Sequence, residues 1–157
     1  MNTPRDMTPS RPFEAFLVLA SRFRNIEVAE RAIVDLGAAA GLTSDDEYWL
    51  VTALREAVAN AMRHGNHEDP ALKVTIDCSI SPHRVAIAVA DDGDGFDPAS
   101  IPDPTDAANL LRPCGRGIFY MRKFMTRVQF DRTATGGTLV LLERDLQPPG
   151  RRPTDEI

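Results

Sequence analysis

The sequence predicts an α+β two-layer sandwich, in which a mainly antiparallel sheet carries helices on one face. Two observations support this prediction. Short apolar segments, some in strict alternation with polar or small residues, are typical of strands. Longer segments with apolar residues at every third or fourth position are typical of helices with one buried face. The length of 157 residues favours a single domain with a substantial core.

The first half of the chain is predicted to form one strand and then two helices. Residues 13–20 are rich in Phe, Leu and Val and predict the strand. A helix is expected over 25–40, where a glycine follows as a natural stop. Ser44 with Glu47 three residues later resembles a capping box, so a second helix is expected over 44–64. The residues expected to face the core from these helices are Ile26, Ala29, Ile33, Leu36, Ala40, Leu50, Leu54, Val58 and Ala61.

The second half is predicted to complete the sheet. Residues 73–80 and 85–91 alternate between larger apolar and polar or small side chains, as neighbouring strands do. Residues 118–125 return to helical spacing. The segments 128–131 and 138–142 predict a last hairpin around a Thr-Gly-Gly turn.

Proline distribution predicts the boundaries of the domain. Residues 1–12 and 147–157 are proline-rich and are expected to be flexible tails around a domain at 13–146. Four prolines and weak periodicity also mark residues 92–114. A connection this long inside one domain is usually functional or disordered, so we expect a mobile lid here.

Charge and cysteine content exclude some classes of function. A net charge of −5 argues against direct nucleic-acid binding, which needs a basic surface. The chain lacks an apolar run long enough to cross a membrane, so no membrane association is expected. Cys78 and Cys114 are far apart in sequence, which favours reduced thiols and a cytoplasmic location.

Residues with the chemistry of a nucleotide site end the second predicted helix and the strand at 85–91. Glu56 and Asn60 share a helical stripe with His64, because residues four apart are neighbours on a helix. An amide and a carboxylate provide the hard oxygen atoms that magnesium prefers. Asp91 ends an apolar strand and is followed by glycines at 93 and 95, which allow close backbone approach to a ligand. Together the two stretches point to ATP.

Two further features are weaker when taken alone. Gly115 and Gly117 precede a helix, where free backbone N–H groups can bind phosphate, although such glycines are frequent without a ligand. Thr138 begins a strand after two glycines and is nearly as consistent with an ordinary β-branched strand residue. Taken singly, Asn60 is more typical of a solvent-facing helix position, and an aspartate such as Asp91 is common in a turn that ends a strand.

Taken together, these segments resemble the anti-sigma-factor serine/threonine kinases, a branch of the histidine-kinase-like ATPase superfamily. The resemblance covers Phe13 to about Glu143. It rests on four segments in the family order, namely Glu56-x-x-x-Asn60-Ala61-x-x-His64-Gly65, Asp91-x-Gly93-x-Gly95-Phe96, Gly115-x-Gly117-Ile118 and Gly136-Gly137-Thr138. These segments are more specific for the fold than for the activity.

The resemblance implies a role for each matching residue. Glu56 corresponds to the general base, Asn60 to the magnesium ligand and Asp91 to the residue that accepts a hydrogen bond from adenine. Thr138 corresponds to a threonine near that aspartate. The glycines correspond to positions that bind the nucleotide: Gly93, Gly95, Gly115 and Gly117.

The same resemblance implies an activity and partners. The expected protein is a cytoplasmic homodimer that uses Mg-ATP to phosphorylate a serine of an anti-anti-sigma antagonist and sequesters a sigma factor. One alternative is an ATP-binding partner-switch module without catalysis, which acts by sequestration only. Another is a detached histidine-kinase catalytic domain, whose partner would present a histidine.

Overall fold

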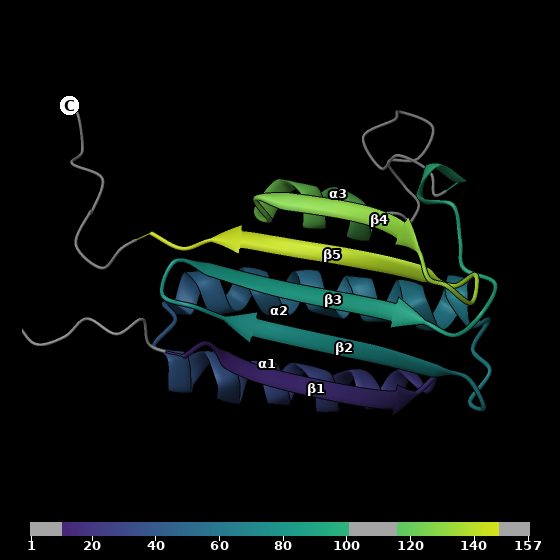
Figure 1. The fold of residues 1–157 in the computed structure, drawn as a ribbon, viewed down its shortest axis with the longest axis horizontal. Helices are drawn as coiled ribbons and strands as arrows, with labels where there is room; N and C mark the ends of the chain where they lie inside the picture. Colours follow the sequence, from purple (N-terminus) through teal and green to yellow (C-terminus); the bar gives the residue numbers. More distant parts are fainter. Residues whose placement is uncertain (1–10, 101–115, 148–157) are drawn as a thin grey trace, which may run out of the picture.

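The computed structural model of the protein describes residues 11–100 and 116–147. Within them, a five-stranded sheet is covered on one face by three α-helices, as Figure 1 shows. The strands are β1 (Phe13–Ala20), β2 (Lys73–Ile80), β3 (Arg84–Asp91), β4 (Arg127–Arg132) and β5 (Thr138–Asp145). The helices are α1 (Ile26–Ala40), α2 (Ser44–Asn60) and α3 (Arg116–Phe124). The predicted α+β two-layer fold is confirmed.

The strand order β1-β2-β3-β5-β4 brings the end of β3 beside the start of β5. Every neighbouring pair is antiparallel. Ala90 of β3 pairs with Leu139 of β5, so Asp91 and Thr138 meet at one end of the sheet. Val74 pairs with Asp91 on the other side. The topology therefore places Asp91 between two backbone segments, β2 and the start of β5, that are distant from it in sequence.

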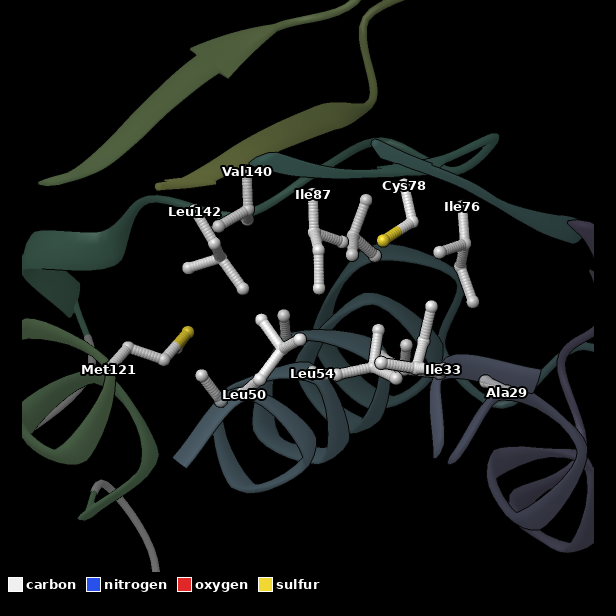
Figure 2. Packing of buried hydrophobic residues seen from close by; sticks show 14 of the residues in the cluster. Ala29, Ile33, Leu50, Leu54, Ile76, Cys78, Ile87, Met121, Val140 and Leu142 are labelled. Atoms are coloured by element: carbon white, nitrogen blue, oxygen red, sulfur yellow. The ribbon is translucent and has the colours of Figure 1, made fainter. Parts of the chain in front are cut away.

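The core lies between the helices and the inner face of the sheet. Figure 2 shows side chains from all three helices directed towards residues of β2, β3 and β5. Ile33, Leu54 and Met121, one from each helix, are fully buried. On β2 and β3, the buried apolar positions alternate as predicted, and they are Val74, Ile76, Cys78, Ile80, Val85, Ile87 and Val89. Burial of apolar surface at about 25 cal/mol per Å² is the main force that holds the two layers together.

The helix α2 begins at Ser44 as predicted, but its cap differs from the predicted one by one residue. The cap is Thr43, whose hydroxyl oxygen accepts a hydrogen bond from the Asp46 backbone N–H at 3.1 Å. The expected pair of Ser44 and Glu47 is wrong, because Ser44 is already the first helical residue. Thr43 adopts the extended backbone that a cap requires. Both pairs have the same spacing, so the sequence pattern alone does not separate them.

A π-helical turn at Ala61–Gly65 follows α2. Its ring is closed by the Asn66 N–H, which donates to the Ala61 carbonyl at 2.8 Å. The sequence predicts a continuous α-helix up to residue 64. The structure instead has a π turn at Ala61–Gly65, in which each hydrogen bond spans five residues rather than four. Short π turns are frequent at functional sites, because they redirect the side chains that follow.

Several expectations concern residues that the structure does not describe. The predicted tails lie outside the described residues, apart from residues 11, 12 and 147, and most of the predicted lid does as well. The domain limits and the lid stay predictions. Among the helices of the described residues, none is long and apolar enough to cross a membrane.

Candidate active site

Asp91 is the buried charged group at the end of β3. Its side chain is 2% exposed. One carboxylate oxygen accepts a hydrogen bond from the Thr138 N–H at 3.1 Å, and the other accepts one from the Gly93 N–H at 3.2 Å. Burial raises the pKa of the Asp91 carboxyl, whereas these two hydrogen bonds and the positive charge of Arg132 act in the opposite direction. The carboxylate is thus fixed in one orientation and keeps further acceptor capacity.

Three glycines allow the backbone to close around Asp91. A Cβ at Gly65 would lie under 3.0 Å from the Asp91 carboxylate, closer than real Cβ atoms approach. A Cβ at Gly137 would come equally close to the Asp91 backbone oxygen, and a Cβ at Gly93 to the Gly65 carbonyl. Only glycine, which has no Cβ, therefore fits at these three positions without a shift of the surrounding atoms.

The loop after β3 is attached to the start of β5. The Thr138 hydroxyl accepts a hydrogen bond from the Phe96 N–H at 2.8 Å. Gly95 has φ +71°, which favours glycine. The ring of His64, just past the end of α2, lies 5.8 Å from the Phe96 ring, measured between centroids. Burial lowers the pKa of His64, with Arg63 acting in the same direction, so we expect a neutral imidazole at pH 7.

Glu56 and Asn60 occupy successive turns at the end of α2. The Asn60 side-chain nitrogen is buried and has no hydrogen-bond partner among the described residues. The half-buried Glu56 carboxylate lies against Gly117 in the first turn of α3, where a Cβ would collide with it. Burial raises the pKa of Glu56, whereas the charges of Arg55 and Arg63 act against that change.

The structure thus brings the predicted residues into two connected groups. The first contains Asp91, Gly93, Gly95 and Thr138, and the second contains Glu56, Asn60 and Gly117. The π turn joins the groups, because it begins next to Asn60 and ends at Gly65 beside the Asp91 carboxylate. Gly115 lies outside the described residues. The roles of all these residues stay predictions.

The sequence did not assign Gly65, Gly137 or Arg132 to the site. Gly65 and Gly137 belong to segments on which the resemblance rests, but the sequence gives neither of them a role at the site. Arg132 carried no signal at all, because its partners belong to other segments. The Gly-Gly pair before β5 was the available clue, since a simple turn seldom needs both glycines.

The residues present fit a nucleotide with its magnesium ion. The unpartnered buried atom of Asn60 is its amide nitrogen, whereas the amide oxygen of the same side chain and the nearby Glu56 carboxylate belong to the hard oxygen class that magnesium takes. The nine-residue helix α3 begins at this site, and phosphate groups bind readily at helix N-termini. Asp91, at the other end of the site, can accept a hydrogen bond from an exocyclic amine of a base.

Comparison with known proteins agrees with this geometry. Residues 19–143 match the family model described as histidine kinase-like ATPase domain. The chain belongs to the histidine kinase-like ATPase domain family, and ATP use follows from that membership.

Three similar proteins share the name anti-sigma F factor. The chain is 30% identical to the anti-sigma F factor of Oceanobacillus iheyensis over 136 residues, which is 85% of this chain and 92% of the relative. It is 29% identical to the anti-sigma F factor of Bacillus subtilis, with the same coverage. It is 34% identical to the anti-sigma F factor of Clostridium novyi over 101 residues, which cover 61% of this chain and 68% of the relative.

Proposed function

We propose that this protein is an ATP-dependent anti-sigma-factor serine/threonine kinase. It would phosphorylate a serine of a small anti-anti-sigma antagonist and sequester a sigma factor. Membership in the ATPase domain family and the shared name of the relatives support the proposal. The single observation that carries the kinase step is the position of Glu56, one turn before Asn60 and against the start of α3.

Each residue has a task in the proposed reaction. Asp91 accepts a hydrogen bond from the adenine amine, while Thr138 holds the Asp91 carboxylate in place through its backbone N–H. The first turn of α3, including Gly117, offers N–H groups to the phosphates. Asn60 would hold Mg²⁺, and the ion, when bound, would offset the negative charge of the phosphates.

Glu56 is the proposed general base. A serine hydroxyl of the antagonist would attack the γ-phosphorus, the bond to the bridging oxygen of ADP would break, and Glu56 would take the hydroxyl proton. A positioned base of this kind contributes a factor of about 10²–10⁴ in rate. Burial favours the role, because a raised pKa gives the ionised carboxylate a stronger affinity for the proton.

The oligomeric state and the cellular location are also part of the proposal. We propose a homodimer formed through β1 and its neighbourhood, supported by the exposed apolar side chains of Phe13, Phe16 and Val18 on this edge strand. An exposed apolar edge strand otherwise favours aggregation. A cytoplasmic location is proposed as well, supported by the free buried thiol of Cys78.

Nucleotide binding and phosphate transfer test the proposal separately. Mg-ADP at about 100 times its dissociation constant should stabilise the fold by about 2.7 kcal/mol, or roughly 5–10 °C in melting temperature. Mg-GTP should do much less. Transfer is then measured with labelled ATP and candidate antagonists from the same genome, followed by location of the phosphoserine. Equal shifts with both nucleotides would refute the adenine site, and binding without transfer to a tightly bound antagonist would favour a switch module that acts by sequestration only.

A further inference from the structure

Arg132, the last residue of β4, joins two loops at the Asp91 end of the sheet. Its Nη1 donates hydrogen bonds to the Asp94 carbonyl at 2.6 Å and to the Gly136 carbonyl at 2.9 Å. Asp94 belongs to the loop after β3, and Gly136 belongs to the turn between β4 and β5. One cationic nitrogen thus links the two segments that border Asp91. Hydrogen bonds from a charged donor are about twice as strong as neutral ones.

The contact between Arg132 and the loop depends on Gly95. A Cβ at Gly95 would lie under 3.0 Å from Nη1 of Arg132 and from the Thr138 hydroxyl oxygen. The backbone of Gly95 also has φ +71°, a conformation that other residues rarely adopt. The guanidinium therefore occupies the space that a side chain at position 95 would need. The need for glycine at position 95 is therefore explained by the packing of Arg132 as well as by the approach of a ligand.

Arg132 completes a set of hydrogen bonds that hold the segments around the Asp91 carboxylate. Asp91 accepts from the N–H of Thr138, and the Thr138 hydroxyl accepts from the N–H of Phe96. Arg132 fastens the residues before Phe96 to the turn before Thr138. The positive charge of Arg132 also lowers the pKa of Asp91, against the effect of burial. Loss of the arginine would leave the loop held mainly by the two hydrogen bonds between Phe96 and Thr138 and by the Gly93 N–H bond to Asp91.

We propose that Arg132 is a positioning residue of the nucleotide site, which holds the Asp94–Phe96 loop against the β4–β5 turn and so keeps Asp91 aligned with the adenine amine. The inference rests on the proposed function, because it takes Asp91 as the residue that recognises adenine. Arg132 itself is exposed and acts through the loop rather than by contact with the base. Both carbonyls that it binds can be hydrated when it is removed, so the fold should tolerate its loss.

The test compares Arg132→Gln with Arg132→Lys and with the control Arg127→Gln. Arg127 is an exposed arginine at the opposite end of β4, where it contacts Gln129 and Glu143. Two quantities are measured on each folded protein: the affinity for Mg-ADP by calorimetry, and the hydrogen-exchange rate of the Phe96 amide without nucleotide. The amide reports the loop directly, because it donates to the Thr138 hydroxyl.

Arg132→Gln should bind Mg-ADP about tenfold more weakly and exchange the Phe96 amide at least several-fold faster. Arg132→Lys, which keeps a cationic donor, should lie between this variant and the wild type. Arg127→Gln should match the wild type in both measurements.

Three results would overturn the inference. One is unchanged affinity in Arg132→Gln, and another is lost affinity with unchanged Phe96 exchange, which would indicate action through charge alone. The third is an equal loss in Arg127→Gln. If the wild type binds Mg-ADP and only these comparisons fail, the proposed function stands without the arginine. If the wild type binds no adenine nucleotide at millimolar concentration, the proposed function fails and the inference with it.

Discussion

Replacement of Glu56 by Gln separates catalysis from binding in this protein. The amide has nearly the shape of the carboxylate and fits beside Gly117, but it is not a base. The loss of a general base predicts that phosphate transfer falls by about 10²–10⁴, which corresponds to roughly 2.7–5.5 kcal/mol in the activation free energy. Mg-ATP affinity should change by no more than a few-fold, because the proposed contact to adenine lies at Asp91 rather than at Glu56.

The raised pKa of Glu56 predicts how Glu56→Gln changes the stability of the fold. Because burial raises this pKa, protonated Glu56 favours the folded state at low pH. That contribution is lost as the pH rises from the ordinary glutamate value, about 4.3, through the raised folded-state pKa. At neutral pH, Glu56→Gln should therefore be at least as stable as the wild type. Thermal unfolding measures the stability of Glu56→Gln. If the variant is as stable as the wild type, a loss of phosphate transfer is not caused by unfolding.

The assay is single-turnover transfer from labelled Mg-ATP to the antagonist over a range of pH. The wild-type rate should rise with pH through the raised pKa of Glu56 and then level off, and the variant should lose this rise. Glu47→Gln, at the other end of the same helix, is the matched control and should keep the wild-type rate. Transfer at the wild-type rate by Glu56→Gln would refute the assignment of Glu56 as the base.

Four further outcomes follow from the structure. Asp91→Asn should weaken adenine-nucleotide binding by roughly 1.5–3 kcal/mol, the range for a hydrogen bond to a charged group, and unchanged calorimetric affinity would return Asp91 to a turn role. Asn60→Ala should remove the dependence of nucleotide affinity on magnesium, which a titration with and without the metal would detect; a dependence that persists would place the metal elsewhere. Gly65→Ala should destabilise the fold by roughly 1–3 kcal/mol, because its Cβ would meet the Asp91 carboxylate, and denaturant unfolding measures this. Burial raises the pKa of the Cys78 thiol to about 12, so thiol reagents at pH 8 should modify it only after unfolding, as followed by mass spectrometry of the peptide that contains Cys78; rapid modification of Cys78 itself in the folded protein would contradict its burial.

Local patterns were sufficient for most of the fold. The alternation in β2 and the helical spacing in α1 depend on which face each element buries, and that information lies within the element. The start of α2 was less certain, because Thr43 and Ser44 are both good caps with an acidic residue three positions later. The π turn was missed, since its wider ring depends on where the following chain must go rather than on residue type.

The site was predictable where its residues stand in compact sequence segments. Glu56, Asn60 and Asp91 fall in such segments, and in the structure Glu56 lies against Gly117 and Asp91 lies against Gly93, while their roles stay predictions. The packing of Gly65 and Gly137 on Asp91 was not predictable in this way, because it joins segments that meet only after the sheet has formed. The contacts of Arg132 were the least predictable, because its two hydrogen bonds go to backbone carbonyls, which residues of every type have.

The most direct test of the central claim is the transfer of the γ-phosphate of labelled Mg-ATP to a small antagonist protein that this chain binds. The account predicts an acid-stable phosphoserine on the antagonist, formed by the wild type and reduced at least about 10²-fold with Glu56→Gln. An acid-labile phosphohistidine, or no transfer to an antagonist that binds tightly, would contradict the account.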